Sequence, residues 1–204
     1  MKRKMHILAI IIMILPSLCS LGYGYDSILV QDDESKVVLS TRAESKDTQL
    51  LDFLQENKIN TVNDYAQWLE KNIHYEKVSI NEEWTAWQET LARGYGDCKN
   101  LSALNTKVLE ILGYAPVLIG YKDEPEGHLF TTFMKDGVLN IFDNTKYYVT
   151  KLTTIDQVSM VIYQKYNVES IFEVTLNPWS VELLYTRAML AKLTEGKQTL
   201  QIGL

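Results

Sequence analysis

The spacing of apolar residues changes at Gly113, and this change constrains the fold more than any other feature of the sequence. Before Gly113, apolar residues recur with the period of a helix, which predicts helices starting near Asp47 and over 62–72 and 97–112. After Gly113 the pattern is typical of strands. The predicted strands are 115–121, 128–134, 138–142 and 147–152. Helices followed by an antiparallel sheet predict an α+β fold.

Capping and turn residues support these boundaries. Thr61 is a suitable N-cap for the second helix, and Asp97 for the third. Gly113 ends the third helix, and Asp136-Gly137 predicts a hairpin turn. The last part of the chain is predicted to be helical, then extended, then helical again, over 155–166, 170–176 and 179–193 respectively.

The first residues have the composition of an export signal. Three cations at 2–4 precede an unbroken apolar run at 7–15, which is shorter than the roughly 20 residues that a transmembrane helix needs. We therefore expect a signal peptide at 1–22 and a periplasmic or secreted protein. An uncleaved anchor, or lipidation at Cys19, is the alternative.

Two further segments follow the signal. Residues 23–45 are expected to form an N-terminal extension or tether, in which 27–30 and 36–41 could be short strands. Residues 46–204 are expected to form the folded domain.

Loss of the signal makes an already acidic protein more acidic. The full chain has a net charge of -6, and removing the three cations at 2–4 takes it to -9. Such a charge offers no electrostatic footprint for nucleic acid or for an anionic membrane surface beyond the signal or anchor. Removal of the signal also removes Cys19. Cys98 is then the one cysteine of the mature chain, so an internal disulfide is excluded.

Cys98 lies where a thiolate would be stabilised. It begins the third predicted helix, directly after Gly94-Tyr95-Gly96-Asp97. The free N–H groups and the positive end of the helix dipole favour an anion at that position. The same N–H groups could hold the oxyanion of an acyl intermediate. The alternative is that Cys98 is a small buried residue of an apolar helix.

A hairpin supplies partners for this thiol. A turn at 136–137 makes paired residue numbers sum to about 273, which brings Asp143 one strand away from His128. A carboxylate in that place would orient the imidazole. The other histidine of the mature chain, His74, is interpreted as structural, and Trp87 as a packing residue by default.

The sequence resembles the transglutaminase-like superfamily, and within it the exported bacterial transglutaminase-like cysteine peptidases. The resemblance covers roughly 73–144 and rests on four elements. These are W-T-A-W-Q-E-T-L with the Gly-rich turn and G-D-C at 84–98, L-G-Y at 112–114, G-H at 127–128 and D-N at 143–144. It implies a papain/transglutaminase-like fold in which the nucleophile helix packs on an antiparallel sheet. It also implies Cys98 as nucleophile, His128 as general base and acid, and Asp143 as orienting residue, with Trp87 or Gln88 lining the substrate or oxyanion site.

Two positions depart from the family pattern. Trp87 occupies a place where proline is usual, and Lys99-Asn100 follow the cysteine where calcium-dependent members have acidic residues. Lys99 would oppose a cation, so we expect no metal site of that kind and no cofactor. The departure also puts a role in processing biofilm adhesins in doubt.

The expected activity is acyl transfer at protein amide bonds. Attack by water gives a cysteine peptidase, which we favour, while attack by water or lysine at glutamine gives a deamidase or transglutaminase. The other readings are a non-catalytic binding module of the cell envelope and an adhesin with a Cys98 thioester. The expected partner is a protein or peptide substrate of the envelope, and the expected state is a monomer.

Overall fold

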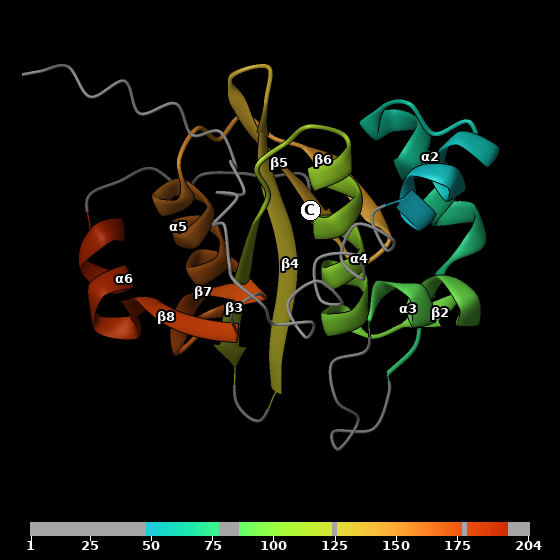
Figure 1. Ribbon diagram of the computed structural model, residues 1–204. Coiled ribbons are helices and arrows are strands. Elements are labelled where there is room, and N and C mark those ends of the chain that lie inside the picture. Colours follow the sequence, from blue (N-terminus) through green and yellow to red (C-terminus); the bar gives the residue numbers. More distant parts are fainter. Residues whose placement is uncertain (1–47, 78–85, 124–125, 177–178, 196–204) are drawn as a thin grey trace, which may run out of the picture. The chain divides into compact units, whose positions relative to one another are not determined.

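A six-stranded antiparallel sheet forms the centre of the fold (Figure 1). In this computed structural model, residues 48–77, 86–123, 126–176 and 179–195 are described, and all belong to the unit Ser40–Leu204. Across the sheet the strands are β6 (Lys146–Val149), β5 (Val138–Asp143), β4 (Glu126–Lys135), β3 (Val117–Asp123), β7 (Ser170–Leu176) and β8 (Trp179–Thr186).

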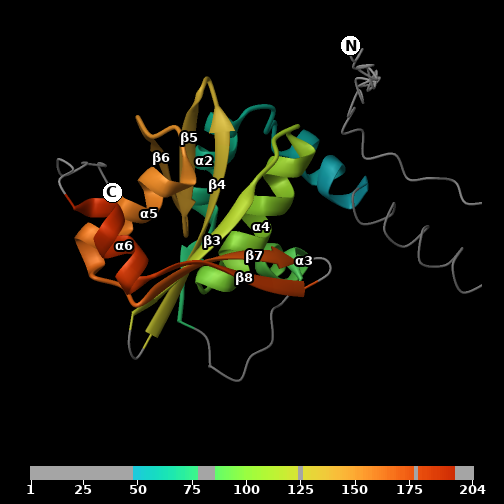
Figure 2. The ribbon, with the colours of Figure 1, turned by 90° about the vertical axis from the view of Figure 1, so that its left-hand side faces the viewer.

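Helices cover both faces of this sheet (Figures 1 and 2). On one face lie the helical segment 48–56, α2 (Val62–Asn72), α3 (Trp87–Arg93) and α4 (Cys98–Ile111). On the other face lie α5 (Ile155–Tyr166) and α6 (Arg187–Thr194). The α+β class and the antiparallel sheet beneath the cysteine-bearing helix are therefore confirmed.

Two apolar cores correspond to the two faces. The first joins α2 and α4 to Phe133 and Phe142, which point from β4 and β5 toward the helices. The second joins α5 and α6 to Phe130 and Ile141, which point to the opposite face of the same two strands. This alternation follows from the two-residue period of a strand.

The local signals in the sequence act as predicted. Thr61 forms a capping box with Asp64 at the start of α2. Asp136 and Gly137 both have positive φ, as a two-residue hairpin turn of this hand requires. The pairing of Thr131 with Phe142 is the predicted register, so the geometry inferred for the hairpin is correct.

The predicted helix over 179–193 is wrong in its first half. Residues Trp179–Thr186 form β8, which pairs with β7, and only Arg187–Thr194 is helical. A short apolar run with one glutamate is compatible with a helix or with a strand. It forms a strand here because it pairs with the edge of β7.

Several predictions fall on residues outside the described ranges. They are the signal at 1–22, the extension at 23–45 and the strands at 27–30 and 36–41, and these remain predictions. Among the helices of the described ranges, none has both the length and the hydrophobicity to cross a bilayer.

Candidate functional site

Cys98 is the first residue of α4, and its half-buried side chain packs against apolar residues of the sheet. The preceding residue, Asp97, is the N-cap, and its carboxylate accepts from the backbone N–H groups of Lys99 and Asn100 at 2.9 and 3.2 Å. The Asn100 side chain in turn accepts from the Asp97 N–H at 3.2 Å. This reciprocal cap fixes the start of the helix and with it the position of the thiol.

A short parallel bridge holds the chain that leads into Cys98. Strand β1 (His74–Tyr75) pairs with β2 (Tyr95–Gly96), two strands too short to be predicted from sequence. Gly96 also approaches the helix closely, because a Cβ there would lie 2.7 Å from Asn100 Cβ. The side chain of His74 is largely exposed and contacts Glu76, and its structural role remains a prediction.

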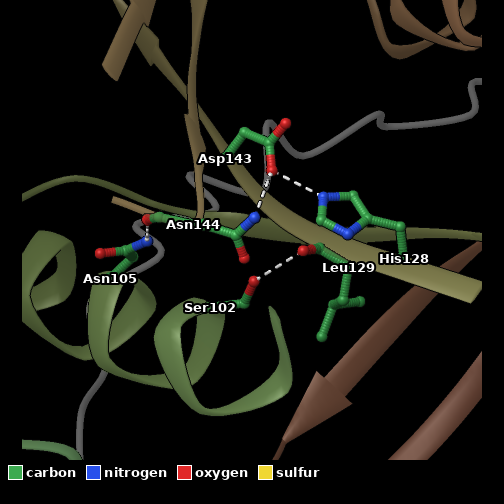
Figure 3. Close-up of polar contacts among 6 residues, drawn as sticks. All are labelled: Ser102, Asn105, His128, Leu129, Asp143 and Asn144. Carbon is green, nitrogen blue, oxygen red and sulfur yellow. Dashed lines mark hydrogen bonds and ion pairs between the residues drawn. The ribbon is translucent and has the colours of Figure 1, made fainter. Parts of the chain in front are cut away.

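His128 and Asp143 form a direct side-chain pair. His128 lies on β4 and Asp143 ends β5, and their Nε2 and Oδ1 atoms are 2.6 Å apart (Figure 3). Because Asp143 occupies Nε2, the other ring nitrogen, Nδ1, is the one left to face a thiol. The predicted neighbourhood of these two residues is thus present in the structure.

The ionisation of His128 reflects three surroundings. Burial of the ring lowers the pKa of His128, but hydrogen bonds with Asp143 and with the Cys98 thiol outweigh it and raise the pKa to about 9. At neutral pH the ring is therefore protonated. An imidazolium next to the sulfur stabilises a thiolate and can donate a proton to a leaving amine.

Aromatic rings surround the imidazole. The rings of His128 and Tyr121, its partner across the ladder, have centroids 5.5 Å apart, and the Phe130 ring stacks at 6.4 Å. A pocket beside these rings is lined by His128, Asp143 and residues of α5. Its cavity volume of about 20 Å³ is enough for about one water molecule. The pocket is therefore too small to bury a substrate side chain.

Asn144 connects Asp143 to the helix that carries the thiol. It lies in the turn between β5 and β6 with φ 53°, a left-handed conformation that asparagine tolerates. Its Nδ2 donates to Asp143 Oδ1 at 3.3 Å, and its backbone carbonyl accepts from Asn105 Nδ2 at 3.0 Å. Asn105 Oδ1 accepts from the Tyr65 hydroxyl at 2.7 Å, so both ends of this fully buried amide are used.

One face of α4 forms hydrogen bonds with backbone carbonyls next to His128 on β4 and next to Asp143 at the end of β5. Ser102, one turn after Cys98, donates to the carbonyl of Leu129, the residue next to His128, at 3.1 Å. Asn105, a second turn on, holds the carbonyl next to Asp143 (Figure 3). Positions separated by four and then three residues share one helix face. The helix that begins with Cys98 therefore sets the places of His128 and Asp143.

Comparisons with known proteins give distant likenesses of fold only. No protein-family model and no curated protein matches the sequence. One similar solved structure is a candidate cysteine protease from Cytophaga hutchinsonii, with 21% identity and a TM-score of 0.40. It matches over 48% of this chain, which spans only 37% of that protein.

A second similar structure is Legionella pneumophila LapG in its calcium-bound form. It has 15% identity and a TM-score of 0.43, with 74% of this chain and 81% of that chain covered. Both are distant, so the function has to be judged from the residues of this chain.

Trp87 and Gln88 both lie at the start of α3. Trp87 packs against the apolar core beneath α2 and α4, which accounts for it as a packing residue. Gln88 is half-buried, and its Oε1 has no hydrogen-bond partner in the described part of the chain. A role for either residue in lining the substrate or oxyanion site remains a prediction.

The surroundings of Lys99 do not fit a calcium site. Lys99 Nζ lies 3.3 Å from Asp97 Oδ2, so the carboxylate next to the thiol already has a cation. Within the described ranges, no group of three or more acidic, histidine or cysteine side chains is placed to hold a metal ion.

Sequence reasoning missed the residues that position the site. Ser102, Asn105 and Tyr65 carry polar groups, and each residue is fully buried. Buried polar groups nearly always have hydrogen-bond partners, but their burial became visible only in the folded chain.

Proposed function

We propose that this protein is an exported cysteine peptidase of the transglutaminase-like type, with Cys98, His128 and Asp143 as its catalytic triad. The observation that supports this most is the place of the His128 ring, whose Nε2 lies 2.6 Å from Asp143 Oδ1 and whose pKa is raised by Asp143 and by the Cys98 thiol at the start of α4. A buried structural cysteine would not need a charged imidazole beside it.

The proposed reaction has two steps. The Cys98 thiolate attacks the carbonyl carbon of an amide, and the His128 imidazolium gives its proton to the leaving amine as the C–N bond breaks. Neutral His128 then takes a proton from water, which attacks the thioester and releases the acid and the thiolate. Asp143 holds the ring in place and stabilises its charged form in both steps.

The test compares Cys98→Ala with the wild-type protein on two substrates. Casein reports hydrolysis, and a glutamine donor with an amine acceptor reports cross-linking. We expect hydrolysis of casein by the wild type and none by Cys98→Ala, with Cys19→Ser as active as the wild type. Equal activity of Cys98→Ala and the wild type on both substrates would refute the proposal.

We also propose that the protein acts outside the cytoplasm as a monomer, on a protein or peptide of the cell envelope. The basic and apolar residues at 1–15 support export. Fractionation of cells and the mass of the mature protein would test this, and light scattering would test the monomer. A protein that stays in the cytoplasm would contradict it.

A further inference from the structure

The face of β7 and β8 that adjoins Cys98 is apolar. Cross-strand partners point to the same face of a sheet, and here Val174 is opposite Val181 and Phe172 is opposite Leu183. Val174 belongs to a buried cluster with Leu118 of β3, which shows that this is the face on which α4 packs. We call Phe172, Val174, Leu176, Val181 and Leu183 the apolar shelf.

The outer part of this shelf is uncovered. Val181 and Leu183 are 53% and 58% exposed, whereas Val174, one strand further in, is 4% exposed. The opposite face of the same two strands carries Glu173 paired with Glu182. Strands β7 and β8 therefore expose part of their apolar face to solvent beside α4. In a covered sheet this face would be buried.

The shelf is continuous with the thiol. Cys98, Phe172 and Leu176 all pack against one buried cluster, formed by Leu118, Leu129 and Val174. Cys98 and the inner end of the shelf therefore share one buried apolar cluster.

Gly120 keeps the inner end of the shelf flat. A Cβ at Gly120 would lie 2.2 Å from Phe172 Cε2, so the Phe172 ring rests directly on the β3 backbone. Gly120 pairs with Leu129 on one side and with Phe172 on the other. The ring is thus held beside the strand that carries His128.

The dimensions suit a short extended peptide. Neighbouring strands are about 4.8 Å apart, so the distance from β3 to β8 is about 10 Å, or about three residues of extended chain. The pocket beside His128 is too small for a side chain. The exposed Val181 and Leu183 give the shelf apolar surface for two side chains near the thiol.

We propose that the apolar shelf binds aliphatic side chains of the substrate next to the bond that Cys98 attacks. The occupant is an extended segment rich in residues such as leucine and valine. As a statement about substrate, this rests on the proposed peptidase activity. As a statement about a binding surface beside Cys98, it can be tested without that activity.

The test compares two alkylating agents in a Cys19→Ser background, in which Cys98 is the one thiol. Iodoacetamide has no apolar arm, whereas iodoacetyl-Leu-Leu-amide has one. The rate of modification of Cys98 is followed by intact mass for the parent protein, for Val181→Ser/Leu183→Ser and for Val149→Ser. Val149 is a matched control, because it is an aliphatic residue 69% exposed on β6, at the other end of the sheet.

We expect the parent and Val149→Ser to react about tenfold faster with the leucine reagent than with iodoacetamide, after correction for the reagents' rates with free cysteine. In Val181→Ser/Leu183→Ser this preference should fall to less than about twofold, with the iodoacetamide rate unchanged. No preference in the parent, or a preference that survives in the double variant, overturns the shelf.

A second measurement tests the shelf even if Cys98 does not react with either alkylating agent. Binding of dansyl-Leu-Leu-amide to Cys98→Ala, followed by anisotropy, should weaken at least about fivefold in the shelf variant and remain unchanged in Val149→Ser. If Cys98 is alkylated slowly but dansyl-Leu-Leu-amide still binds, the peptidase proposal is refuted and the shelf proposal is upheld. If Cys98 is alkylated fast but without a preference for the leucine reagent, the shelf proposal is refuted and the peptidase proposal is upheld. Dimers that Val181→Ser/Leu183→Ser dissociates would overturn the shelf as a substrate surface.

Discussion

His128 and Asp143 meet across the ends of two neighbouring strands, with Nε2 and Oδ1 2.6 Å apart. Their side chains are 22% and 30% exposed, so the pair is partly shielded from water but open to a substrate. The raised pKa of His128, to about 9, reflects this pair and the thiol together. The first two predictions follow from it.

Replacing Asp143 should slow catalysis without unfolding the protein. In Asp143→Asn the ring loses its carboxylate, so we expect kcat on casein to fall about 10²- to 10⁴-fold with little change in KM. Asp136→Asn, at the exposed hairpin turn, is the matched control and should keep full activity. An active Asp143→Asn would remove Asp143 from the triad.

The stability of the protein should fall as the pH rises from about 6.5 to about 9. The pKa of His128 is raised on folding, so its contribution is fully present below about pH 6.5 and is lost as the pH passes through about 9. The contribution is on the order of 3 kcal/mol.

Urea unfolding at pH 6, 7.5 and 9.5 checks this prediction. The difference in free energy of unfolding between the wild type and His128→Gln should shrink over that range. His74→Gln, which replaces an exposed histidine, should follow the wild-type curve. A constant difference between wild type and His128→Gln would contradict the raised pKa.

Asn105 should matter for both stability and catalysis. Asn105→Ala leaves the Tyr65 hydroxyl and the Asn144 carbonyl without partners, which should cost about 1–3 kcal/mol of folding free energy. Because the same carbonyl is next to Asp143, we also expect kcat per folded molecule to fall about tenfold, with the pH profile of kcat/KM displaced.

Tyr65→Phe is the control for this prediction. It removes the hydroxyl but leaves the bond from Asn105 to Asn144, so stability should fall while kcat per folded molecule stays near the wild-type value. Equal kcat values for Asn105→Ala and Tyr65→Phe would show that Asn105 is only structural.

Calcium should have no effect on this protein. The Asp97 carboxylate caps α4 and is ion-paired with Lys99, so a calcium ion there would have to displace the Lys99 ammonium. We expect the same Tm and the same rate on casein in EDTA and in millimolar calcium. A rise in Tm of several degrees on adding calcium would show a site that involves other residues.

Much of the site follows from local sequence. Asp97 specifies the start of α4, and thereby where Cys98 lies, through hydrogen bonds that span three residues. The turn at Asp136-Gly137 sets the register of β4 and β5, and this brings Asp143 to His128. Both are short-range effects, which a sequence encodes through residue type and spacing.

The rest depended on partners far along the chain. Residues 179–186 form a strand because they pair with β7. The local sequence pattern does not predict that β7 has an unpaired edge there. The bonds from Ser102 to Leu129 and from Asn105 to Asn144 join residues 27 and 39 positions apart.

The sequence by itself thus determined which residues could do chemistry and where each lies within its own helix or strand. Only the tertiary structure decided that one face of α4 holds both partner strands and that the apolar face of β8 lies open beside Cys98. The physical reason is that burial and hydrogen bonding between distant segments exist only once the chain has packed.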